Sequence, residues 1–229
     1  MTTKHLPILL FILLGFSTIH YSKHTVSSFP TPSVPTSNTP ATYKNNIRSI
    51  YRIALQEPTG VRVLGSGIAI SAHHVIIAKH MLEQSTLFLI QDVAANKQCD
   101  GAFVRCAETA DIALLETTAT LSNFIHLEFK PEFELGDDIY IIGCRWGLTP
   151  YDIRHGSLSY LKYVNALSDE LILSSVDAKP GDSGGGVFDS KHNFIGMVSG
   201  SLGGCQPGIS DNMDFVPVTR IKTFMLLHL

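Results

Sequence analysis

A serine surrounded by glycines is the most chemically suggestive feature of the sequence. Ser183 lies in residues 180–186 (PGDSGGG), with glycines on both sides. A nucleophilic serine needs an exposed hydroxyl on a tight turn and nearby N–H groups that can hold a developing oxyanion. Glycines supply the unusual backbone conformations of such a turn. Ser183 is therefore a candidate nucleophile, although ordinary glycine-rich turns are also common.

A serine nucleophile needs a base, and the base needs an orienting acid. His80 follows the β-forming run 75–77 (VII), which would hold the imidazole on a rigid element. Asp111 is the one acid in the apolar run 110–115 (ADIALL), and a buried carboxylate requires a partner. Taken alone, Asp111 fits a turn cap at the edge of a strand. Together, His80, Asp111 and Ser183 predict a catalytic triad.

Residues 181–185 (GDSGG) also match the G-x-S-x-G motif of α/β-hydrolases. That class places its acid and histidine after the serine, on a fold of alternating strands and helices. Little of the chain follows Ser183, and no such alternation precedes it. We therefore exclude this class.

Composition and patterning predict an all-β protein. The chain has 229 residues, 45% of them hydrophobic, and a net charge of −3, which argues against a nucleic-acid binder. From residue 48 on, short β-rich runs alternate with turn signals, as in a sandwich or closed barrels. Apolar residues at 218, 221, 224, 225 and 226 predict a closing helix over 218–229.

The N-terminal residues are expected to lie outside this domain. Residues 1–21 contain a basic start followed by a short apolar run, which predicts a cleaved signal peptide or a membrane anchor. Residues 22–44 are rich in Ser, Thr and Pro, and they read as a linker. Localisation is accordingly secreted or periplasmic, or membrane-anchored and facing outward, with a possible tether through the apolar segment.

The four cysteines permit three disulfide pairings. Cys99 and Cys106 are close in sequence and are candidates for one bridge, which would leave Cys144 and Cys205 for a second. The alternative is that they are free buried thiols. Their spacing fits no zinc-site pattern, and we expect neither a metal nor a cofactor.

The motifs from residue 48 to 220 resemble those of trypsin-like (chymotrypsin-fold) serine proteases, in particular short HtrA-type domains without a PDZ domain. Six segments carry the resemblance, in the family's order: 65–71 (GSGIAIS), 77–80 (IAKH), 111–115 (DIALL), 135–143 (LGDDIYIIG), 181–185 (GDSGG) and 196–200 (GMVSG). The resemblance implies a protease domain over 45–229. It would consist of two six-stranded antiparallel β-barrels, near 45–122 and 133–217, followed by the helix.

The resemblance also assigns roles to residues. Ser183 would attack the peptide carbonyl, His80 would carry the proton and Asp111 would orient the imidazole. The N–H groups of Gly181 and Ser183 would form the oxyanion hole. A protein or peptide would be the substrate. Two positions depart from the family pattern: Ile77 stands where Thr or Ser is usual, and Gly186 where Pro is usual.

Substrate preference depends on Asp177, six residues before Ser183. In trypsins this spacing places an acid at the base of the S1 pocket, which selects Lys or Arg; in HtrA-type proteases a similar acid is structural and small apolar residues are preferred. Both alternatives stay open. Residues 199–201, Ser199, Gly200 and Ser201, are expected to form the pocket wall and to pair with an extended substrate.

Asp182 matches an acid of the digestive proteases in this family. In those proteins, cleavage of the chain creates a new N-terminal ammonium that pairs with this acid. The only cut point that resembles an activation site, Arg52-Ile53, lies too close to Gly65, so we expect no such zymogen switch. Two other functions compete with a general endopeptidase. One is a protease that matures a single substrate or itself. The other is a non-catalytic binding module that retains the fold.

Overall fold

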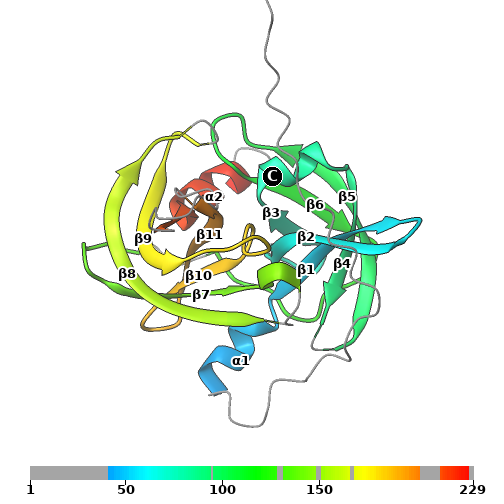
Figure 1. Ribbon diagram of the computed structural model, residues 1–229, viewed down its shortest axis with the longest axis horizontal. Coiled ribbons are helices and arrows are strands. Elements are labelled where there is room, and N and C mark those ends of the chain that lie inside the picture. The colour runs from blue at the N-terminus through cyan, green and yellow to red at the C-terminus, as the bar shows by residue number, and fades with distance from the viewer. Residues whose placement is uncertain are drawn as a thin grey trace, which may run out of the picture. The chain divides into compact units, whose positions relative to one another are not determined.

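The computed structural model describes residues 41–93, 95–127, 131–147, 151–165, 168–201 and 212–226. These residues form two closed six-stranded antiparallel barrels and a C-terminal helix, which confirms the predicted all-β fold. Figure 1 shows the first barrel on the right and the second on the left. The expected leader, residues 1–21, and most of the expected linker lie outside the described residues.

The first barrel contains six strands: β1 (Ile50–Glu57), β2 (Gly60–Ala69), β3 (His74–Ile77), β4 (Leu87–Asp92), β5 (Lys97–Cys106) and β6 (Ala113–Thr117). Their order around the barrel is β1-β2-β3-β6-β5-β4, and pairing of β1 with β4 closes it. Apolar side chains such as Ile53, Val75, Ile77, Ile90 and Leu115 fill the interior. A 3₁₀ helix, η1 (Lys79–Glu83), follows β3.

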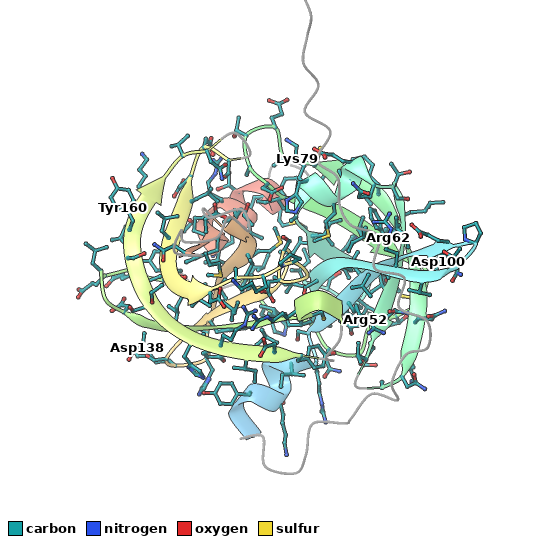
Figure 2. The ribbon with its side chains drawn as sticks, viewed as in Figure 1. Arg52, Arg62, Lys79, Asp100, Asp138 and Tyr160 are labelled. Carbon is teal, nitrogen blue, oxygen red and sulfur yellow. The ribbon has the colours of Figure 1, made fainter. Side chains whose placement is uncertain are left out.

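The second barrel contains β7 (Asp138–Gly143), β8 (Asp152–Tyr163), β9 (Leu171–Asp177), β10 (Gly186–Asp189), β11 (Phe194–Ser201) and β12 (Asn212–Pro217). Their order is β10-β11-β12-β9-β8-β7, and pairing of β10 with β7 closes the barrel. A short 3₁₀ helix, η2 (Arg145–Gly147), follows β7. Figure 2 shows side chains filling both barrels, whereas the labelled Tyr160 and Asp138 lie on the outside of the second.

A shared hydrophobic core joins the two barrels. Ile50, Ile68 and Ile112 from the first barrel belong to the same buried cluster as Ile142 and Phe188 from the second. Full burial of each such side chain contributes about 1.5–3 kcal/mol relative to exposure. The barrels are therefore packed as one unit, and residues placed at their junction are held firmly.

Helix α2 (Val218–Leu226) closes the chain as expected, and the final residues 227–229 lie outside the described part. Val218, Ile221, Phe224 and Met225 are buried against the core, but Leu226 is 75% exposed. The apolar stripe thus ends one residue earlier than the sequence indicated. Among the described residues, no helix has the length and apolar character to cross a membrane.

Residues 41–44, which the sequence placed at the end of the linker, belong to helix α1 (Ala41–Ile47). Contacts with the second barrel account for this ordering. The Tyr43 ring packs edge-on against Tyr140 and His192, and Ile47 is buried in the shared core. Tertiary packing therefore determines this helix, which the local composition did not predict.

The predicted bridge between Cys99 and Cys106 is wrong. Both residues lie on strand β5, and both are free thiols. Seven residues of extended strand separate their Cα atoms by roughly 23 Å, whereas a disulfide needs Cα atoms about 4.4–6.8 Å apart. Cys144 is buried, and its predicted partner Cys205 lies outside the described residues.

Candidate active site

The residues of the predicted base and acid lie at neighbouring ends of paired strands. His80 follows β3 in the first turn of η1, beside Lys79, which Figure 2 labels. Asp111 lies two residues before β6, which pairs with β3 so that Ile77 lies opposite Ala113. The register of these two strands therefore brings His80 and Asp111 together, as the sequence predicted.

The carboxylate of Asp111 accepts three hydrogen bonds. His80 Nδ1 lies 2.9 Å from Oδ2, and the backbone N–H of His80 donates to Oδ1 at 2.9 Å. The hydroxyl of Ser199 donates to Oδ2 at 2.7 Å. A carboxylate bound to Nδ1 holds the proton on that nitrogen, which leaves Nε2 as the basic atom.

These contacts set the charges of the pair. Burial would raise the pKa of Asp111, but the hydrogen bond and charge of His80, together with the Ser199 hydroxyl, lower it below its usual value. Burial would lower the pKa of His80, but the hydrogen bond and charge of Asp111 outweigh burial and raise it. Asp111 therefore remains ionised, and His80 is a stronger base than an isolated imidazole.

Ser183 lies in the turn that precedes β10, where Gly181 and Gly184 have φ angles of 99° and 80°. The Ser183 hydroxyl donates to Ser199 O at 3.2 Å, and among the described residues it makes no hydrogen bond to His80. Ser199 thus contacts two members of the predicted triad, through its hydroxyl to Asp111 and its carbonyl to Ser183. Catalytic hydrogen bonds often form fully only in the substrate complex.

The two N–H groups of the expected oxyanion hole are available to a substrate oxygen. In the part of the chain that the structure describes, neither Gly181 nor Ser183 donates its N–H to a protein acceptor. The turn is closed instead through Asp182, whose N–H donates to Lys179 O at 3.0 Å and whose carbonyl accepts from Gly185 N–H at 2.7 Å. The geometry of the turn is therefore compatible with an oxyanion site.

Asp182 is completely buried, and an ion pair that the sequence analysis missed compensates its charge. Arg154 Nη2 on strand β8 contacts Asp182 Oδ1, and Lys179 N–H donates to Oδ2 at 2.6 Å. Burial raises the pKa of Asp182, while Arg154 opposes that effect. Arg154 Nη1 also donates to Asp177 O. Arg154 thus pairs with the acid that, in digestive proteases, pairs with a newly formed N-terminal ammonium.

Asp177, the candidate specificity residue, ends strand β9, and in the described part of the chain it forms no hydrogen bond or ion pair with the predicted triad. Its half-exposed carboxylate pairs with Lys179 Nζ at 2.7 Å and with Arg145 Nη2 at 3.8 Å. Two cations of the chain itself therefore lie against this acid.

The other three expected substrate-binding residues lie at the end of strand β11. The Ser199 side chain is directed to Asp111, so only its main chain faces Ser183. Gly200 pairs with Asp214 on β12. Ser201 is the last residue of the strand, and its side chain lies outside the described part.

Asp214 is a third buried acid near the site, and the sequence analysis did not identify it. It is 3% exposed, and Asn165 Nδ2 donates to its Oδ2 at 3.3 Å. Burial, with a contribution from the charge of Asp111, raises the pKa of Asp214 to about 6. A lone acid in the apolar run 212–217 (NMDFVP) is the same signal that identified Asp111.

A cleft of about 590 Å³ adjoins His80 and Asp111. Residues from both barrels line it, including Glu83, Glu108, Asn165 and Asp169. Among the described residues, no group of three or more His, Cys, Asp or Glu side chains has the arrangement of a metal site. The cleft is lined by the predicted base and acid, and Ser183 is not among its lining residues.

The fold and site define a trypsin-like serine peptidase domain. The model of the trypsin-like peptidase domain family matches residues 59–197, and the chain belongs to that family. A comparison with curated proteins found no match.

Solved structures show the same fold. The HtrA-type protease AlgW with a tripeptide superposes with a TM-score of 0.69 at 17% identity, covering 81% of this chain and 61% of that one. A serine-to-alanine variant of AlgW gives 0.70 at 16% identity, with the same coverage. An inactive serine-to-alanine mutant of Rv3671c from M. tuberculosis H37Rv gives 0.64 at 16% identity, covering 87% of this chain and 96% of that one. The chain thus spans less than two thirds of AlgW.

Proposed function

We propose that this protein is an exported serine endopeptidase that cleaves peptide bonds through His80, Asp111 and Ser183. The carrying observation is the threefold hydrogen bonding of the Asp111 carboxylate, which orients His80. Such an arrangement has little use in a binding module, because it prepares Nε2 to accept a proton. The unoccupied N–H groups of Gly181 and Ser183 supply the second requirement of acyl transfer.

The reaction proceeds in two stages. Ser183 Oγ attacks the peptide carbonyl while His80 Nε2 accepts the hydroxyl proton, and Asp111 stabilises the imidazolium. The N–H groups of Gly181 and Ser183 bind the oxyanion, and His80 passes its proton to the leaving amine. Water, activated by the same imidazole, then hydrolyses the acyl-enzyme.

We propose a small apolar residue at P1, the alternative that the HtrA-type resemblance offers. The support comes from Asp177, because Lys179 and Arg145 already lie against its carboxylate. A Lys or Arg of the substrate would have to displace these cations, whereas a small apolar side chain would not.

The support for export is the sequence of residues 1–21, with its basic start and apolar run. The same segment supports a membrane tether if it stays uncleaved. Fractionation of cells producing the full chain, with N-terminal sequencing of the product, tests both. Recovery of the whole chain from the cytosol with its N-terminus intact would contradict export.

The proposed function is tested with the full chain and its Ser183→Ala variant on a diverse peptide library, read by mass spectrometry. We expect cuts after small apolar residues in the wild type alone. Cuts after Lys or Arg would restore Asp177 as the S1 acid. Equal cutting by both proteins, or by neither, would contradict the proposed serine mechanism.

A further inference from the structure

We propose that Ser66 of strand β2 is a positioning residue that fixes the oxyanion hole from the other barrel. Its side chain is completely buried. Its hydroxyl donates to Gly181 O at 2.8 Å and accepts from the N–H of Cys144 at 2.9 Å. Its own N–H donates to Ser183 O at 2.8 Å. This inference rests on the proposed function.

Ser66 therefore contacts both ends of the segment that carries the two oxyanion N–H groups. Gly181 has a φ of 99°, a conformation that glycine adopts readily but from which it also departs readily. Holding the carbonyls of Gly181 and Ser183 restricts rotation of the peptide groups between and beside them. Asp182, which lies between these residues, is held by the N–H of Lys179 and the guanidinium of Arg154.

Close packing of the two backbones accompanies these bonds. A Cβ on Gly184 would lie 2.0 Å from Ser66 O, and one on Gly65 would lie 2.7 Å from Ser183 O. Strand β2 thus lies directly against the serine turn. The glycines allow the approach, and Ser66 supplies the polar contacts that fix it. These contacts give a reason for the adjacent residues Gly65 and Ser66, which the triad alone does not explain.

The location of Ser66 gives these contacts a catalytic consequence. His80 and Asp111 belong to the first barrel, and the oxyanion turn belongs to the second. Ser66 is a first-barrel residue bonded to that turn and to Cys144 at the end of β7. It therefore sets the position of the oxyanion donors relative to the imidazole, and catalysis depends steeply on such positions.

The test compares Ser66→Ala with Ser174→Ala in the full chain. Ser174 is an equally buried serine on β9, whose hydroxyl accepts from Val176 N–H at 3.3 Å. For Ser66→Ala we expect kcat to fall roughly 10- to 100-fold, part of the effect of losing an oxyanion donor, with KM nearly unchanged. Affinity for a peptide aldehyde, which forms a tetrahedral adduct, should fall in parallel. Ser174→Ala should change neither quantity.

A purely structural role for Ser66 would give a different result. Both variants would then lose thermal stability while kcat and aldehyde affinity per folded molecule stayed at the wild-type values, and the inference would be overturned. If Ser66→Ala does not fold, Ser66→Cys preserves the side-chain size but supplies a weak donor. An intermediate loss of kcat supports the inference, and a wild-type kcat in Ser66→Cys overturns it.

Hydrogen exchange tests the same contacts without any activity. In Ser66→Ala, and in Ser66→Cys to a smaller extent, deuterium uptake by a peptic fragment covering residues 179–188 should be faster than in wild type. Ser174→Ala should leave that fragment unchanged. Unchanged uptake in Ser66→Ala overturns the inference, even if the wild type cleaves peptides. Faster uptake in a protein that cleaves no peptide upholds the contacts and contradicts only the proposed function.

Discussion

Arg154, which is 13% exposed, forms an ion pair with the completely buried Asp182 in the turn that carries Ser183. The two residues come from different parts of the second barrel, strand β8 and the turn before β10. The pair supplies internally the cation that digestive proteases obtain by cutting their own chain. The absence of such a zymogen switch stays a prediction.

Replacement of Arg154 by Gln leaves the buried Asp182 carboxylate without its cation. We expect a loss of about 3–5 kcal/mol in the free energy of unfolding, together with reduced peptidase activity. The difference in the free energy of unfolding between the variant and the wild type should decrease at acidic pH, where Asp182 becomes protonated and no longer needs a cation. Urea unfolding across pH measures both effects, with the exposed Arg62→Gln as control. A deficit below 1 kcal/mol at neutral pH would contradict the role of the pair.

The raised pKa of His80 predicts the acidic limb of the activity profile. Because His80 must be neutral to accept a proton, kcat/KM should fall as pH decreases through an apparent pKa above the usual 6.5. Asp111→Asn removes the charge that raises this pKa, and it should reduce kcat on the order of 10⁴-fold. The surface variant Asp100→Asn is the control. An acidic limb well below 6.5 in the wild type would refute this assignment.

Asp214 should lower stability at neutral pH. Burial raises the pKa of Asp214 to about 6 in the folded protein, from its ordinary value of about 3.9. The folded state therefore binds the proton more tightly, and stability falls as pH rises between these values. Asp214→Asn should stabilise the protein by up to about 3 kcal/mol above pH 6, and by little near pH 4. Denaturant titrations at pH 4.5 and 7.5 measure the difference. An equal effect at both values would contradict the shift.

The geometry of strand β5 predicts that Cys99 and Cys106 are alkylated without a reductant. Cys106 is exposed and should react first. Cys99 should react more slowly, because it is half-buried and burial raises the pKa of its thiol. Cys144 should be protected, because burial raises its pKa to about 12. Peptide mapping after iodoacetamide treatment of the folded protein identifies the modified residues. A disulfide-linked fragment containing Cys99 and Cys106 would refute this arrangement.

Local patterns predicted the parts of the site that local sequence determines. Ser183 and His80 are identifiable because their functions require a glycine-rich turn and the end of a β-run, and both features lie within a few residues. The barrels follow from short β-rich runs whose apolar residues recur in the buried cores. The family resemblance added the number of strands and their division into two barrels.

The sequence did not predict which side chains of distant strands contact one another. Several arginines were available, and only the barrel geometry selects Arg154 as the partner of Asp182. Ser199 was expected to form part of the pocket wall, which stays a prediction; its hydrogen bond to Asp111 depends on the orientation of β11 and was not foreseen. Cys99 and Cys106 were paired because they are close in sequence, yet extended strand keeps them apart. Asp214 was missed although the rule that identified Asp111 applied to it.

The measurement that tests the central claim most directly is labelling of the full chain with an active-site phosphonate, followed by peptide mapping. We predict a single phosphonyl group on Ser183, no labelling of the Ser183→Ala variant, and strongly slowed labelling of His80→Ala. Absence of labelling in the wild type, or labelling that persists in Ser183→Ala, would contradict the proposal that His80, Asp111 and Ser183 form a working catalytic triad.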